Sequence, residues 1–144
     1  MVHVVQDPVE YVRERPQMFL RSGRVGGREL AESILGDALI LTDGPVTVMR
    51  RGGWWLVGCE EDWMARQSSG SVDDLFSKIV PFPEAGPNSM HSEVLLTAFA
   101  KEVLTKDETT LRAIKGFVAE DDEVCGILRR ASHWKRGVAF RIGP

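Results

Sequence analysis

The chain has 144 residues, of which 43% are hydrophobic and 27% are charged, a balance typical of folded globular proteins that excludes a disordered chain. At this length we expect a single domain over residues 1–144 with one core, because a chain of this size buries roughly two-thirds of its unfolded surface. The formal net charge is −3. This charge disfavours nucleic acid as the main partner, since phosphate-binding surfaces are basic. Only a local patch of arginines near the C-terminus supports nucleic-acid binding.

The cysteines and the lengths of the apolar runs indicate in which cellular compartment the protein is expected. Cys59 and Cys125 are far apart and neither belongs to a C-x-x-C pair, so a zinc ribbon or a disulfide framework has little support. The first ten residues contain Asp7 and Glu10 and no apolar run, and no later window approaches twenty apolar residues. We therefore expect a soluble cytoplasmic protein without a membrane segment.

The first predicted element lies in residues 8–22, PVEYVRERPQMFLRS. Asp7 followed by Pro8 suits a helix start, because a carboxylate caps the first turn and a proline N–H is not needed there. Pro16 disfavours helical geometry at Arg15 and so ends the segment. The apolar side chains that follow are expected to be buried: Met18, Phe19 and Leu20.

A longer helix and a hairpin follow. Apolar residues recur at three- and four-residue spacing over residues 28–41, which predicts a helix with one buried face. Residues 46–51 and 54–58 are rich in β-branched and aromatic side chains and are joined by two glycines, which predicts an antiparallel hairpin. Alternation along the second strand places Trp55 and Val57 on one face and Trp54 and Leu56 on the other.

Three more helices and one strand are expected in the second half. The sequence from Ser71 to Asp74 predicts a capped helix. Ser89 begins a helix whose inward residues extend to Val103, and the capping-box spacing of residues 105–108 predicts another helix, over 105–118. The four carboxylates of residues 120–123 suggest a solvated loop or a helix start, since hard cations need converging oxygens. A short helix from Cys125 and a strand over 138–142 complete the chain.

The opening run V-R-E-R-P-Q-M-F resembles the start of the ATPase domain of the DNA gyrase B subunit and its topoisomerase relatives. In that family, a short helix leads into R-K-R-P-G-M-Y. The match covers residues 9–22. The family's arm helps to close the nucleotide pocket and contacts a second subunit. The resemblance therefore implies partner-binding roles for residues of the arm formed by residues 8–22. The simpler alternative is that these residues only form a helix and a turn that lead into the domain. The implied residues are Tyr11, Arg13, Arg15, Met18 and Phe19.

The order of arm, helix, hairpin, loop, helix and strand is similar to the gyrase B type of GHKL ATPase across most of the chain. This similarity implies an α/β two-layer sandwich in which a mixed or antiparallel sheet carries helices largely on one face. The family's catalytic positions can therefore be sought in this sequence.

The first of these positions is the family's E-x-x-x-N pair, in which glutamate orients the attacking water and asparagine holds Mg²⁺. Alignment through residues 36–39 places Glu29 at the general base and Ser33 at the metal ligand. Glu32 becomes the metal-ligand counterpart if the alignment shifts by one residue. The resemblance thus keeps a base and changes the metal ligand.

The other two nucleotide motifs are altered. Where the family has D-x-G-x-G, this chain has C-E-E-D-W at residues 59–63, so Asp62 or Glu60 would meet adenine while Trp63 and Met64 occupy the space that glycines leave open. The glycine-rich phosphate loop is replaced by P-N-S-M-H-S-E at residues 87–93.

A metal site formed by His91 and Glu93, or an acid–base pair formed by them, is disfavoured, because residues i and i+2 of a helix do not face each other. We therefore expect no metal ligands.

The leading hypothesis is a gyrase B-like module that has lost ATP hydrolysis, needs no cofactor, and binds a protein partner or a second copy of itself. The alternative is a divergent Mg²⁺-dependent ATPase of the GHKL class that uses Glu29 as base, Ser33 or Glu32 on the metal, and Asp62 on adenine. A nucleic-acid-associated accessory role rests on fold analogy alone.

Overall fold

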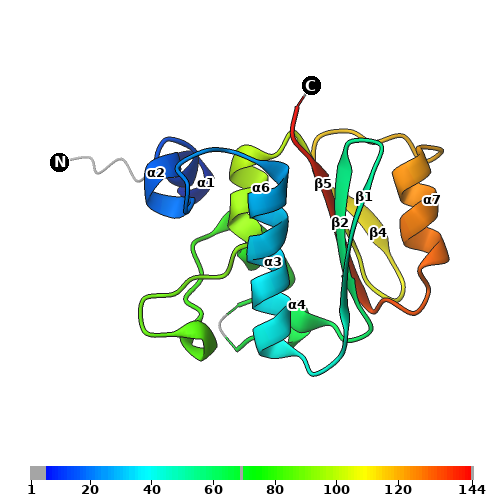
Figure 1. Ribbon diagram of the computed structural model, residues 1–144, viewed down its shortest axis with the longest axis horizontal. Helices are drawn as coiled ribbons and strands as arrows, with labels where there is room; N and C mark the ends of the chain where they lie inside the picture. Colours follow the sequence, from blue (N-terminus) through cyan, green and yellow to red (C-terminus); the bar gives the residue numbers. More distant parts are fainter. Residues whose placement is uncertain (1–5, 69, 144) are drawn as a thin grey trace.

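The computed structural model describes residues 6–68 and 70–143. Its centre is a five-stranded antiparallel sheet with the strand order β1-β2-β5-β3-β4 (Figure 1). The strand that comes last in the sequence, β5, therefore lies in the middle of the sheet. The strands are β1 (Val46–Arg51), β2 (Trp54–Cys59), β3 (Glu102–Lys106), β4 (Leu111–Lys115) and β5 (Arg136–Arg141).

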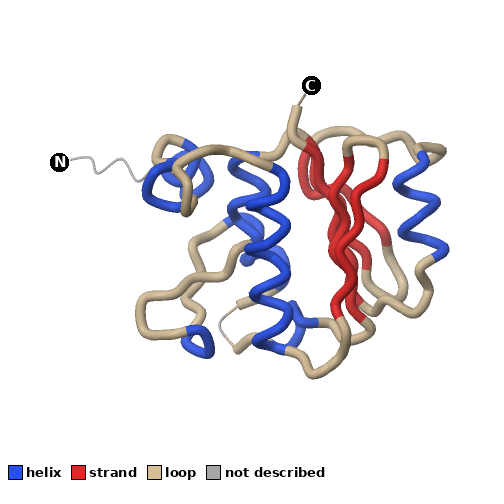
Figure 2. The backbone as a smooth tube through the Cα atoms, in the orientation of Figure 1, coloured by secondary structure: helices blue, strands red, loops and turns tan. Residues whose placement is uncertain are grey.

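Helices cover both faces of the sheet (Figure 2). α3 and α6 lie on one side and α7 lies on the other. The expected α/β domain with an antiparallel sheet is therefore confirmed. The domain has three layers instead of the expected two, because α7 forms a layer of its own. The helices are α1 (Pro8–Arg13), α2 (Pro16–Phe19), α3 (Gly27–Leu41), α4 (Trp63–Arg66), α5 (Val72–Ser77), α6 (Glu93–Phe99) and α7 (Glu123–Arg130), with a 3₁₀ turn η1 (Pro83–Ala85) before α6.

The β1–β2 hairpin forms as the sequence predicts. Its turn residues Gly52 and Gly53 have φ angles of 58° and 85°, the left-handed conformation that a tight two-residue hairpin requires. Val57 faces the larger core between the sheet and α3, whereas Trp54 and Leu56 face the smaller core beneath α7. The predicted alternation of the strand is therefore confirmed.

Each face of the sheet has its own core. The larger one is formed with the helices of the α3 side and includes Leu30, Ile34, Trp63, Phe76, Leu96 and Phe140. The smaller one is formed with α7 and includes Trp54, Leu56, Leu104, Leu128 and Trp134. None of the described helices is both long and apolar enough to cross a membrane.

The helix predicted for residues 105–118 is wrong, because this region forms the β3–β4 hairpin. The residue that favours the turn is Asp107, whose carboxylate accepts hydrogen bonds from the backbone N–H groups of Thr109 and Thr110, each at 2.8 Å. α6 ends at Phe99 instead of continuing to Val103, since residues 102–106 pair with β5. Long-range strand pairing thus overrides the local helical signal.

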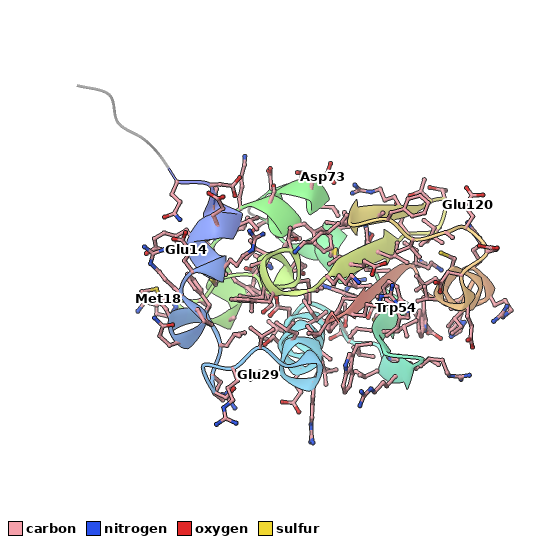
Figure 3. The ribbon with its side chains drawn as sticks, turned by 90° about the horizontal axis from the view of Figure 1, so that it is seen from above. Glu14, Met18, Glu29, Trp54, Asp73 and Glu120 are labelled. Atoms are coloured by element: carbon pink, nitrogen blue, oxygen red, sulfur yellow. The ribbon has the colours of Figure 1, made fainter. Side chains whose placement is uncertain are left out.

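The helix start predicted for the N-terminal arm is confirmed, whereas the burial predicted for the end of the arm is confirmed only in part. The Asp7 carboxylate caps α1 by accepting from the Val9 N–H at 2.8 Å. Leu20 is buried as predicted, but the burial predicted for Met18 is wrong, because its side chain is 62% exposed and points outward at the edge of the molecule (Figure 3). The single turn of α2 directs this side chain to solvent.

Two glycine substitutions test the packing of the sheet. A Cβ atom at Gly58 would overlap the indole of Trp134, whereas a Cβ at Gly36 meets no atom within 4 Å. We expect Gly58→Ala to lower the free energy of unfolding by about 1–3 kcal/mol, and Gly36→Ala, in the interior of α3, to raise it by roughly 0.5–1 kcal/mol. Urea denaturation of both variants measures the difference; equal stabilities would contradict this packing.

Candidate functional site

A pocket of about 360 Å³ opens beside α3. The residues that line it come from the segment before α3, from α3 itself and from the residue before α6: Arg21, Glu29, Glu32, Ser33, Gly36, Asp37, Ile40 and Ser92. The pocket therefore brings together Glu29 and Ser33, the positions that the resemblance assigns to catalysis and metal binding, together with the alternative Glu32. Asp62 is not among its lining residues.

Glu29 and its neighbours are already engaged in local contacts. The Glu29 carboxylate accepts from the backbone N–H of Ser22 at 3.0 Å and from the Ser22 hydroxyl at 2.5 Å. These hydrogen bonds lower the pKa of Glu29, which makes its carboxylate a weaker base. The Ser33 hydroxyl donates to the Glu29 carbonyl at 3.1 Å, and Glu32 pairs with Arg28 at 3.0 Å.

Asp62 lies outside the pocket, directly before α4, and its contacts are structural. One of its oxygens caps α4, accepting from the N–H groups of Met64 at 3.1 Å and Ala65 at 3.3 Å. Arg136 on β5 adds a two-pronged contact, Nε at 2.8 Å and Nη2 at 2.9 Å from the two carboxylate oxygens. Trp63 and Met64, which follow, are fully buried. Asp62 therefore joins the end of the β1–β2 hairpin to the central strand.

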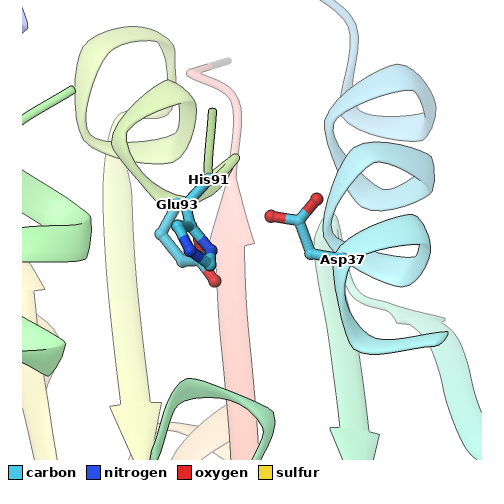
Figure 4. A group of neighbouring side chains, drawn as sticks. All are labelled: Asp37, His91 and Glu93. Atoms are coloured by element: carbon cyan, nitrogen blue, oxygen red, sulfur yellow. The ribbon is translucent and has the colours of Figure 1, made fainter. Parts of the chain in front are cut away.

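Three ionisable side chains converge below the pocket. Asp37 from α3, His91 from the loop before α6, and Glu93 at the start of α6 are 7%, 1% and 0% exposed. One donor atom from each lies within 4.8 Å of the others, and Figure 4 shows Asp37 pointing from α3 toward the other two. We call these residues the buried cluster. Asp37 also lines the pocket, so the cluster adjoins the pocket.

The prediction that His91 and Glu93 do not face each other is wrong. α6 begins at Glu93, so His91 lies in the preceding extended segment, where the i, i+2 argument for helices does not apply. Asp37 was missed altogether, although a sequence signal was present. It lies three residues after Ile34 and directly before Ala38, on the apolar stripe of α3, where a carboxylate is unusual.

The His91 ring is held from two sides. It stacks on Phe82, with ring centroids 4.1 Å apart and planes 5° apart. Backbone hydrogen bonds of 2.9 Å, from the Phe82 N–H to the Ser89 carbonyl and from the His91 N–H to the Val80 carbonyl, close the loop that carries it. Among the described residues, neither ring nitrogen has a hydrogen-bond partner.

The two carboxyl groups have different partners. Both oxygens of Asp37 accept from Ser92, one from its N–H at 2.7 Å and the other from its hydroxyl at 3.0 Å. Glu93 Oε1 accepts from the Trp63 indole N–H at 3.3 Å. Its other oxygen, Oε2, is buried and has no hydrogen-bond partner within the described part of the chain.

Burial sets the protonation of the cluster. It raises the pKa of Asp37 to about 7. Burial, together with the charge of Asp37, raises the pKa of Glu93 to about 8, although Trp63 and Arg136 act in the opposite direction. Burial also lowers the pKa of His91 against the charge of Glu84. Near neutral pH the imidazole is therefore neutral, the Glu93 carboxyl group keeps its proton and Asp37 is close to its midpoint, so the cluster can exchange protons or bind a cation that displaces them.

No protein-family model matches the sequence, and a search of the curated proteins finds no significant match. The gyrase B resemblance therefore stands on the residues of the chain alone.

The pH dependence of stability tests this description of the cluster. Because the pKa values of Asp37 and Glu93 are higher in the folded protein than the unfolded values of about 4, the folded state holds more protons between these values. The free energy of unfolding should therefore fall as pH rises toward 7 and 8, and level off above them. The depressed pKa of His91 acts the other way only below about pH 6.5, where the unfolded imidazole titrates.

Urea denaturation between about pH 6.5 and 8 in a chelating buffer isolates the two carboxyl groups. We expect Glu93→Gln to reduce the fall in stability by up to about 1.4 kcal/mol per pH unit. Glu120→Gln, at an exposed glutamate, is the matched control and should leave the profile unchanged. A Glu93→Gln profile identical to that of the wild type would contradict the assignment.

Proposed function

We propose that this chain is a gyrase B-like domain that has lost ATP hydrolysis and acts as a protein-binding or regulatory module. The observation that carries the proposal is the state of Asp62, the residue aligned with the family's adenine-binding aspartate. Its oxygens already accept four hydrogen bonds within the fold, from Met64, Ala65 and twice from Arg136. Releasing it to adenine would leave the buried Arg136 guanidinium without its carboxylate, which is costly.

The other nucleotide positions support the same conclusion. Glu29 is held by Ser22 at the edge of the pocket, where the hydrogen bonds lower its basicity. The segment aligned with the phosphate loop forms a small hairpin through the Pro81–Met90 bridge and leads into Glu93, which is fully buried. A carboxyl group in that place repels a triphosphate when ionised.

The arm supplies a surface for the proposed protein partner. Arg15 lies over the Tyr11 ring, 3.8 Å from its centroid, and Phe19 contacts the same ring edge-on at 6.0 Å. Met18 is the most exposed of the arm's apolar residues. Arg13 also fastens the arm to the end of α6, since its Nε donates to the Ala98 carbonyl at 3.0 Å.

Nucleotide should have no effect on this protein. With millimolar Mg²⁺ and a non-hydrolysable ATP analogue, we expect an unchanged melting temperature, whereas binding at about 100 times Kd would add about 2.7 kcal/mol and raise it by several degrees. We also expect the same background ATP turnover from the wild type and Glu29→Ala. Turnover that is lost in Glu29→Ala would support the divergent ATPase instead.

The arm should mediate association. If a second copy of the chain is the partner, sedimentation should detect self-association of the wild type, and Met18→Glu should weaken it at least about tenfold, because a charge would enter an apolar contact. Phe117→Glu is the matched control, since Phe117 is 84% exposed and lies far along the chain, in the segment between β4 and α7. Equal effects of the two substitutions would contradict a role for the arm.

A further inference from the structure

We propose that the buried cluster of Asp37, His91 and Glu93 binds a divalent first-row transition cation of the Zn²⁺ type. The proposal concerns a site that the gyrase B resemblance does not include, and it does not depend on the proposed loss of ATP hydrolysis.

The donor set selects this class of cation. Two carboxylates and one neutral imidazole offer oxygen and nitrogen ligands with a total charge of −2, which a divalent ion neutralises. An imidazole nitrogen is a good ligand for zinc and its neighbours, whereas Mg²⁺ and Ca²⁺ prefer all-oxygen sites. Three protein ligands also leave a fourth position for water or a small ligand, as in open zinc sites.

The polar atoms without partners point to an ion. His91 is 1% exposed and Glu93 is 0% exposed, yet both ring nitrogens and Glu93 Oε2 lack hydrogen-bond partners among the described residues. Leaving one such group unpaired costs about 1–3 kcal/mol. A cation bound between them would satisfy one ring nitrogen and the free carboxylate oxygen at once.

The surroundings of the cluster resemble those of a metal site. Ser92 holds both oxygens of Asp37, Trp63 holds one oxygen of Glu93, and the Phe82 stack fixes the plane of His91. Such outer contacts orient metal ligands and retain lone pairs for the ion. Asp62 neutralises Arg136, the cation whose charge acts on Glu93, so a second positive charge can be accommodated nearby.

The spacing of the donors requires a small closure. In a tetrahedral site, ligands at about 2.0–2.1 Å from one zinc ion lie about 3.4 Å apart, and the donor atoms of the cluster lie within 4.8 Å of one another. Side-chain rotations that move each donor atom by less than about 1 Å would bring them to this spacing. The pocket beside α3 provides the route of access, because Asp37 and Ser92 line it, and Glu29 and Glu32 place further negative charge there.

Calorimetric titration of the chelator-treated 144-residue chain with Zn²⁺ tests the proposal. We expect one ion per chain and a rise of several degrees in melting temperature at about 100 times Kd. We expect no comparable binding of Mg²⁺. Glu93→Gln and Asp37→Asn should each weaken Zn²⁺ binding at least about 100-fold. Ser92→Ala, which leaves all three donors in place, should weaken it roughly 10- to 100-fold.

Two controls separate metal binding from loss of structure. Without zinc, Glu93→Gln should melt no lower than the wild type, because near neutral pH the buried Glu93 must take up a proton on folding whereas glutamine need not. His133→Gln, at an exposed histidine outside the cluster, should bind zinc as the wild type does. The proposal is overturned by wild-type protein that does not bind Zn²⁺, or by binding that survives unchanged in Glu93→Gln and Asp37→Asn, which would direct attention to the cysteines.

Discussion

The constraint on which the rest of the structure depends is the burial of the Glu93 carboxyl group. It lies at the junction of the helical layer and the sheet, where Trp63 from α4 donates to it, Asp37 from α3 approaches it and the charge of Arg136 on β5 acts on it. A carboxylate without compensation at such a depth is costly. The approach of Asp37 adds to this cost, and the raised pKa of Glu93 and the proposed cation are two ways of meeting it.

Asp62 and Glu29 are also held by contacts within the fold. Asp62 serves the buried Arg136 and begins α4, which brings Trp63 to Glu93. Glu29 links α3 to the segment that carries Ser22. Both Glu29 and Asp62 accept hydrogen bonds from nearby donors, and the fold would lose these contacts if either side chain were released.

Local patterns predicted the elements whose residues carry strong short-range signals. The Asp7 cap, the helix of residues 27–41, the glycine hairpin and the capping box at Ser71 all depend on neighbours in sequence, and all four are present. The β3–β4 hairpin was mistaken for a helix because its pairing with β5 is a long-range contact. The pair of His91 and Glu93 was rejected because both residues were placed on one helix, whereas α6 begins at Glu93. Asp37 was missed because it meets Glu93 only when α3 packs beside α6.

The most direct test is a crystal structure grown with Zn²⁺ and a non-hydrolysable ATP analogue together, measured for anomalous scattering at the zinc absorption edge. We expect an anomalous peak among Asp37, His91 and Glu93 and no nucleotide in the pocket beside Glu29. Nucleotide bound in that pocket, with no peak in the cluster, would contradict it.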